Sequence, residues 1–84
     1  MGALTVARAN ATVDQRFRGQ IEAALAEGVA REDMTLRLTL RDTILLARDP
    51  KTPVHDISYA GGVMRFLGVK VERGGVAGST LDRG

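Results

Sequence analysis

The sequence predicts a small α+β domain in which short strands pack against two helices. Apolar residues follow a helical period between residues 13 and 27, and apolar and polar residues alternate strictly over 34–41. A third observation is a pair of glycine-containing turns that separate short β-type runs after residue 56. These patterns are typical of a helix, a strand and a hairpin, respectively. The length of 84 residues allows one domain and excludes a two-domain enzyme.

The first predicted element is an amphipathic helix over 13–27. Thr12 and Gln15 have the spacing of a capping box, in which the two side chains each bond to the other residue's backbone. The apolar stripe of this helix contains Val13, Phe17, Ile21, Ala24 and Leu25, whereas Asp14, Arg18 and Glu22 stack on another face. Gly28 follows the helix at a position that favours positive φ. We expect one face to pack and the other to meet solvent.

Residues 34–48 allow two interpretations. The alternation favours a strand over 34–38, after which Thr39 and Asp42 have the spacing of a second helix cap. A short helix would then run to Arg48, where Asp49 and the following proline end it. One continuous helix over 34–48 is the alternative.

The C-terminal part predicts a β-hairpin. The runs 57–59 and 63–67 flank Ala60, Gly61 and Gly62, and glycine accepts the positive φ that tight turns require. Beyond the hairpin, the valines of 69–71 have the opposite parity to the apolar residues of 64–66. A β-bulge at Gly68 would return all of them to one face of the sheet, in one bent strand or two short ones.

These elements place a single small α+β domain at 12–73, between a flexible N-terminal arm over 1–11 and a flexible, glycine-rich C-terminal tail over 74–84. The expected core residues are Phe17, Ile21, Leu25, Leu36, Leu38, Ile44, Leu45, Ile57, Met64, Phe66, Val69 and Val71.

Composition removes several kinds of chemistry. The chain has no cysteine and one histidine, so thiol chemistry and cysteine-based metal sites are excluded, and we predict no metal or cofactor. His55 stands beside Asp56, but adjacent residues of an extended segment point to opposite faces, which favours a surface histidine over a catalytic base. No apolar segment has the length of a membrane span. We therefore expect a cytoplasmic protein with no membrane partner.

Arginine placement is the main candidate for a binding function. The chain has twelve basic and ten acidic residues, for a net charge of +2, and ten of the basic residues are arginine. Arg37 lies in the alternating run, and Arg41 and Arg48 fall on one face of the short helix. These three are the candidate residues for an anion or an acidic partner. The favoured alternative is an ordinary solvated face, neutralised by Glu32, Asp42 and Asp49.

Three functions from different classes remain. The favoured one is a non-enzymatic interaction module that forms a homodimer or binds another protein, because a small sheet leaves edges open and a thin core gains from pairing. The second is a nucleic-acid-binding protein, since Ala24, Gly28 and Met34 have helix-turn-helix spacing, although Arg31 and Arg37 occupy positions that should be apolar. A small enzyme using His55 is a minor alternative.

Overall fold

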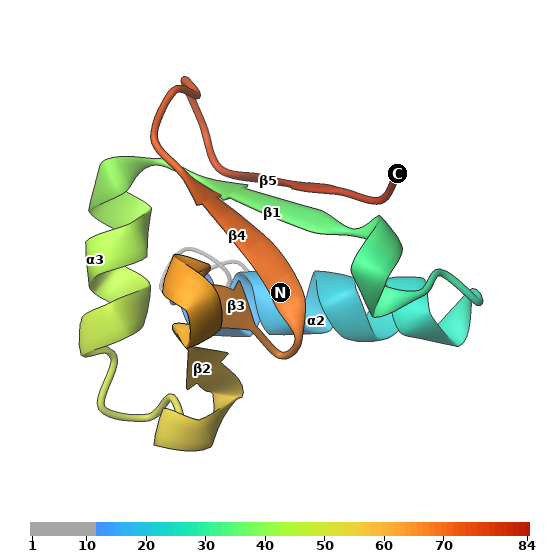
Figure 1. The fold of residues 1–84 in the computed structure, drawn as a ribbon, viewed down its shortest axis with the longest axis horizontal. Coiled ribbons are helices and arrows are strands. Elements are labelled where there is room, and N and C mark those ends of the chain that lie inside the picture. The colour runs from blue at the N-terminus through green and yellow to red at the C-terminus, as the bar shows by residue number, and fades with distance from the viewer. Residues whose placement is uncertain (1–11) are drawn as a thin grey trace, which may run out of the picture.

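Two helices and a five-stranded mixed sheet make up the fold, which confirms the predicted α+β class (Figure 1). The computed structural model describes residues 12–84, so the arm predicted over 1–11 lies outside the described residues. The elements are α2 (Val13–Ala26), β1 (Thr35–Leu38), α3 (Leu40–Arg48), β2 (Ile57–Ser58), β3 (Arg65–Phe66), β4 (Val69–Arg73) and β5 (Thr80–Asp82). The strand order in the sheet is β2-β3-β4-β1-β5.

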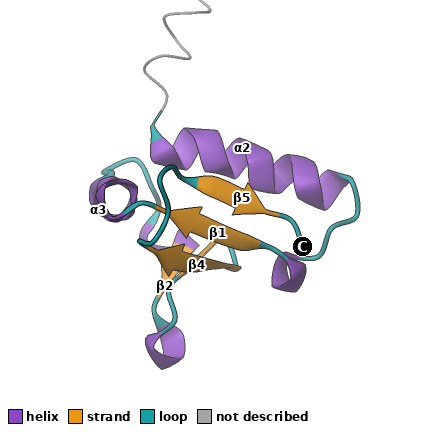
Figure 2. Cartoon of the chain, turned by 90° about the horizontal axis from the view of Figure 1, so that it is seen from above, coloured by secondary structure: helices purple, strands orange, loops and turns teal. Residues whose placement is uncertain are grey.

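Both ends of α2 form as predicted. The Gln15 amide donates to the Thr12 hydroxyl at 3.1 Å, and the Thr12 amide donates to the Gln15 side chain at 3.0 Å, which completes the capping box. At the other end, Gly28 has a φ of 92°, and the Val29 amide donates to the Ala24 carbonyl at 3.0 Å. This is a Schellman ending, which satisfies carbonyls that the last turn leaves free. Figure 2 shows the helix running alongside β5, with which it is in contact.

Residues 34–48 form a strand followed by a helix, not one continuous helix. β1 ends at Leu38, and the Asp42 amide donates to the Thr39 hydroxyl at 3.1 Å, so the predicted second cap starts α3. The strand also rules out the helix-turn-helix arrangement, because β1 occupies the place of the second helix.

The predicted hairpin is present, but the predicted bulge is not. β2 pairs antiparallel with β3, with Ile57 opposite Phe66. β3 then pairs antiparallel with β4 through a two-residue turn, in which Leu67 has a φ of 54° and Gly68 a φ of 81°. Two consecutive positive φ values are typical of a type I′ hairpin turn. The chain reverses at Gly68, so Phe66 and Val69 become cross-strand partners on the same face.

For 74–84 the sequence predicts a flexible tail, yet Thr80–Asp82 forms β5. β5 pairs antiparallel with β1, with Leu81 opposite Leu36, and Leu81 packs against the core. β1 also pairs in parallel with β4, so it lies inside the sheet with a neighbour on each side. The segment contains four glycines, and its strand has only three residues, so its composition does not predict a strand.

The core lies between α2, α3 and the sheet. Eight of the twelve predicted core residues are buried, and Leu25 and Ile57 are partly buried against them. Ile44 and Leu45 are wrongly predicted, because they are 51% and 48% exposed. α3 instead turns Leu46 into the core. Apolar residues surround this short helix on the helical wheel, so periodicity alone does not choose its buried side.

Candidate functional site

Arg37, the first of the predicted binding arginines, is neutralised by neighbours in the sheet. Its guanidinium contacts the Glu72 carboxylate at 2.5 Å and the Asp82 carboxylate at 3.5 Å. The pKa of Asp82 is lowered mainly by the hydrogen bond from the Gly84 amide, and the Arg37 guanidinium lowers it further. Arg37 therefore belongs to an ordinary solvated ion-pair network, although its acidic partners are not those expected from the sequence.

Arg41 and Arg48 lie on the exposed side of α3. Within residues 12–84 neither makes an ion pair. The structure therefore divides the three predicted arginines: Arg37 is engaged on the sheet, and the other two are available on the helix.

His55 lies on an open surface. Its side chain is 86% exposed, and its ring Nε2 is 3.6 Å from one oxygen of Asp56. The other oxygen of Asp56 accepts a hydrogen bond from Arg18. A catalytic base needs partners that enclose it and fix its orientation. The exposed position of His55 does not provide such partners.

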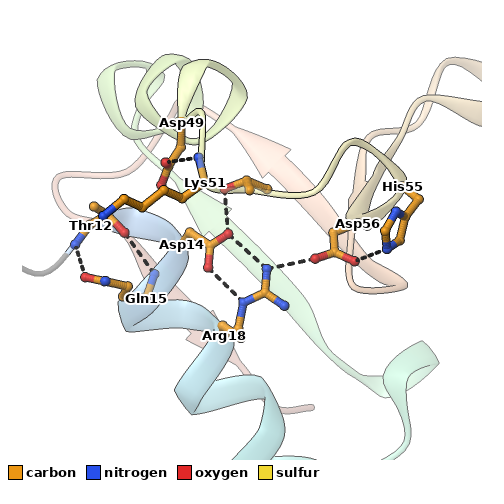
Figure 3. Close-up of polar contacts among 9 residues, drawn as sticks. Thr12, Asp14, Gln15, Arg18, Asp49, Lys51, His55 and Asp56 are labelled. Carbon is orange, nitrogen blue, oxygen red and sulfur yellow. Dashed lines mark hydrogen bonds and ion pairs between the residues drawn. The ribbon is translucent and has the colours of Figure 1, made fainter.

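The sequence does not reveal a partly buried polar network that joins α2 to the segment after α3 (Figure 3). Arg18 donates to both carboxylate oxygens of Asp14, at 2.8 and 3.0 Å, and to Asp56 at 2.8 Å. The Thr52 hydroxyl donates to Asp14 at 2.5 Å. The spacing of Asp14 and Arg18 predicts their i,i+4 contact, but Thr52 and Asp56 are 38 residues away from their partners and no local signal identifies them.

This network is a structural clamp. Asp14 is only 7% exposed. The hydrogen bonds from Arg18 hold its pKa below the usual range, since together with the hydrogen bond from Thr52 they outweigh the effect of burial, which raises the pKa. The two carboxylates raise the pKa of Arg18, whose guanidinium also lies 5.5 Å from the Phe66 ring centre. An open cavity of about 490 Å³ adjoins the clamp. The charged groups of the clamp are already paired with one another. They therefore hold α2 against the segment after α3 and leave few free hydrogen-bonding groups for a ligand.

A second feature is the exposed apolar surface around α3. Within residues 12–84, all the large hydrophobic side chains that are exposed lie on α3 or in the segment 54–59. They are Leu40 (65%), Ile44 (51%), Leu45 (48%), Val54 (91%) and Tyr59 (56%), and we call these five residues the α3 surface.

The two parts of the α3 surface are neighbours in space. In Figure 1 the segment after α3 passes beneath the end of the helix and rises into β2. A hollow of about 480 Å³ lies between them, bounded by Ala47 and Arg48 on the helix and by Val54, Ile57 and Tyr59 on the other side. Ala47 is one turn from Ile44, so the apolar side of the helix continues into this hollow.

Among residues 12–84, no group of three or more potential metal ligands is found, and no helix is both long enough and apolar enough to cross a membrane. Comparisons with protein-family models, with curated proteins and with solved structures find no match to this chain.

Proposed function

We propose that this protein is a non-enzymatic interaction module that self-associates through the α3 surface. The observation that carries the proposal is the concentration of five exposed large hydrophobic side chains on one helix and the adjoining segment. Single exposed hydrophobic residues are ordinary, whereas a cluster typically marks an interaction site. Complete burial of one large apolar side chain in an interface would stabilise the associated state by about 1.5–3 kcal/mol.

A second copy of the chain is the occupant that fits this surface. Two-fold symmetry places the same patch on both sides of an interface, so apolar residues meet apolar residues. Opposite charges also stand at the two ends of α3, Arg41 near its start and Asp49 directly after its end, although Arg48 beside Asp49 adds a like charge to that end. Antiparallel packing of two α3 helices would bring Arg41 of each copy toward Asp49 of the other. We also propose that the dimer acts in the cytoplasm.

The test is Ile44→Glu, which places a charge in the centre of the proposed interface. Sedimentation equilibrium over a concentration series should show a dimer for the wild type and a monomer for this variant. Gln20→Glu is the matched control, because it adds the same charge at an exposed position on α2. A wild-type chain that stays monomeric at millimolar concentration would contradict self-association, as would equal dimerisation of the Ile44→Glu variant.

A further inference from the structure

A hollow of about 360 Å³ on the sheet concentrates positive charge. It is lined by Arg31 and Glu32 from the 3₁₀ turn Arg31–Asp33, by Met34, and by Arg65, Gly68 and Lys70 from the β3–β4 hairpin. Three cations face one carboxylate in this lining, which gives a local net charge of +2. The whole chain also has a net charge of +2. The hollow thus holds as much excess positive charge as the entire chain, and none of its residues belongs to the α3 surface.

Two of the cations are held against each other by strand pairing. Arg65 on β3 lies directly opposite Lys70 on β4. Like charges at such cross-strand positions are destabilising. Lys70 has only a 3.7 Å contact with Glu72, whose other oxygen is engaged by Arg37 at 2.5 Å. Arg65 makes no ion pair within residues 12–84. An anion bound by both the Arg65 and the Lys70 side chains would relieve this repulsion.

The third cation is fixed in place by the hairpin turn. The Arg31 Nε donates to the Leu67 carbonyl at 2.9 Å. The Arg31 side chain also crosses Gly68 so closely that a Cβ there would lie 2.9 Å from the Arg31 Cδ. Gly68 therefore serves both the positive φ of the turn and the approach of Arg31. The terminal guanidinium nitrogens of Arg31 make no hydrogen bond within the described residues, which leaves them free for a ligand.

We propose that this hollow binds the phosphate group of a small ligand. A phosphate has about two negative charges at neutral pH and several acceptor oxygens. It therefore matches three donors arriving from three segments better than a single carboxylate would. Arginine is suited to phosphate recognition because its planar fork presents two parallel N–H donors, and Arg31 is already oriented by its Nε hydrogen bond.

The experiment is a titration of ¹⁵N-labelled full-length protein with orthophosphate and with glucose 6-phosphate, at constant ionic strength, followed by NMR. Glucose is the uncharged control. Saturable shifts are expected at the Arg31 Nε–H and at the amides of Gly68 and Lys70. Tighter binding of glucose 6-phosphate would identify an organic phosphate as the ligand, and equal binding would identify the free anion. Non-saturable drift, or shifts centred elsewhere, would overturn the proposal.

Two variants separate this site from general charge effects. Arg65→Gln should weaken phosphate binding about tenfold, in line with the loss of one charge-assisted hydrogen bond. The same variant should raise the Tm of the ligand-free protein, because it removes the repulsion with Lys70. Arg73→Gln removes an equal charge from a residue outside the hollow and should leave binding unchanged. Equal weakening in both variants would show that only net charge matters and would refute a localised site.

Arg31→Lys tests the role of the fixed guanidinium. This variant keeps the charge but loses the Nε hydrogen bond to Leu67, so binding should still weaken severalfold. Unchanged binding would contradict the orienting role assigned to the hairpin turn. The amide spectrum of each variant reports folding independently of phosphate binding.

Discussion

At the scale of single residues, the Asp14 carboxylate accepts three hydrogen bonds, two from Arg18 and one from Thr52. Burial of a charged group is costly unless it is paired and hydrogen-bonded, and Asp14 has both Arg18 and Thr52 as donors. No buried side-chain nitrogen or oxygen among residues 12–84 lacks a partner. Asp14 therefore supports the fold by joining α2 to the segment after α3.

The lowered pKa of Asp14 predicts how stability depends on pH. A carboxyl group whose pKa is lower in the folded state contributes stability that is fully present above its unfolded pKa of about 3.9. That contribution is lost as the pH falls through the lowered folded pKa. Asp14→Asn should reduce the free energy of unfolding at pH 7 by about 1–3 kcal/mol and flatten the decline of stability below pH 4.

Urea unfolding between pH 7 and pH 2.5 measures both effects. Glu22→Gln is the control, because Glu22 is an exposed acid on the same helix. If the pH dependence of Asp14→Asn matched that of the wild type, Asp14 would not be the group responsible.

At the scale of elements, the sequence predicts local structure well where side chains contact their own neighbours. Thr12 and Thr39 cap the two helices as expected, because each hydroxyl accepts from an amide three residues away. The orientation of α3 is not predictable in this way, because packing against the rest of the core decides that Leu46 is buried while Ile44 is exposed. The candidate site follows the same rule: the sequence identifies the arginines of α3, but it wrongly assigns Ile44 and Leu45 beside them to the core.

β5 shows the same limit more sharply. Three residues among glycines carry little intrinsic strand preference, and the pairing partner β1 lies more than 40 residues earlier in the chain. The sequence likewise predicts a bulge where Leu67 and Gly68 form a hairpin turn, although the parity of the valines correctly predicts that Val69 and Val71 share the buried face.

Deletion of residues 80–84 tests whether β5 contributes to stability. The structure predicts a loss of about 2–4 kcal/mol, because β1 loses hydrogen bonds along one edge and the core loses the cover of Leu81. Deletion of residues 83–84 alone removes the Arg83–Glu27 ion pair, an exposed contact worth less than about 1 kcal/mol. Thermal unfolding of both variants gives the comparison, and equal Tm values would support the flexible tail expected from the sequence.

At the scale of the whole molecule, the fold separates two surfaces of different chemistry. The helix α3 and the segment 54–59 present apolar side chains with two arginines between them, whereas the sheet beside the β3–β4 hairpin presents the basic hollow. Their residues do not overlap, so self-association through the first surface leaves the second accessible. A dimer would therefore carry two phosphate sites, and the Ile44→Glu variant should retain phosphate binding as a monomer.

The two-fold arrangement proposed for the dimer is tested by exchanging charges between the ends of α3. Arg41→Asp should weaken the dimer severalfold, because two favourable pairs with Asp49 become two repulsive ones, each pair being worth about 0.2–1 kcal/mol. Asp49→Arg should weaken it in the same way. The double variant Arg41→Asp/Asp49→Arg should recover dimerisation, and a mixture of the two single variants should form heterodimers in preference to either homodimer. Sedimentation measures the dissociation constants, and urea midpoints check that each variant is folded. Additive losses in the double variant would place Arg41 and Asp49 apart in the dimer and would exclude the antiparallel packing of α3.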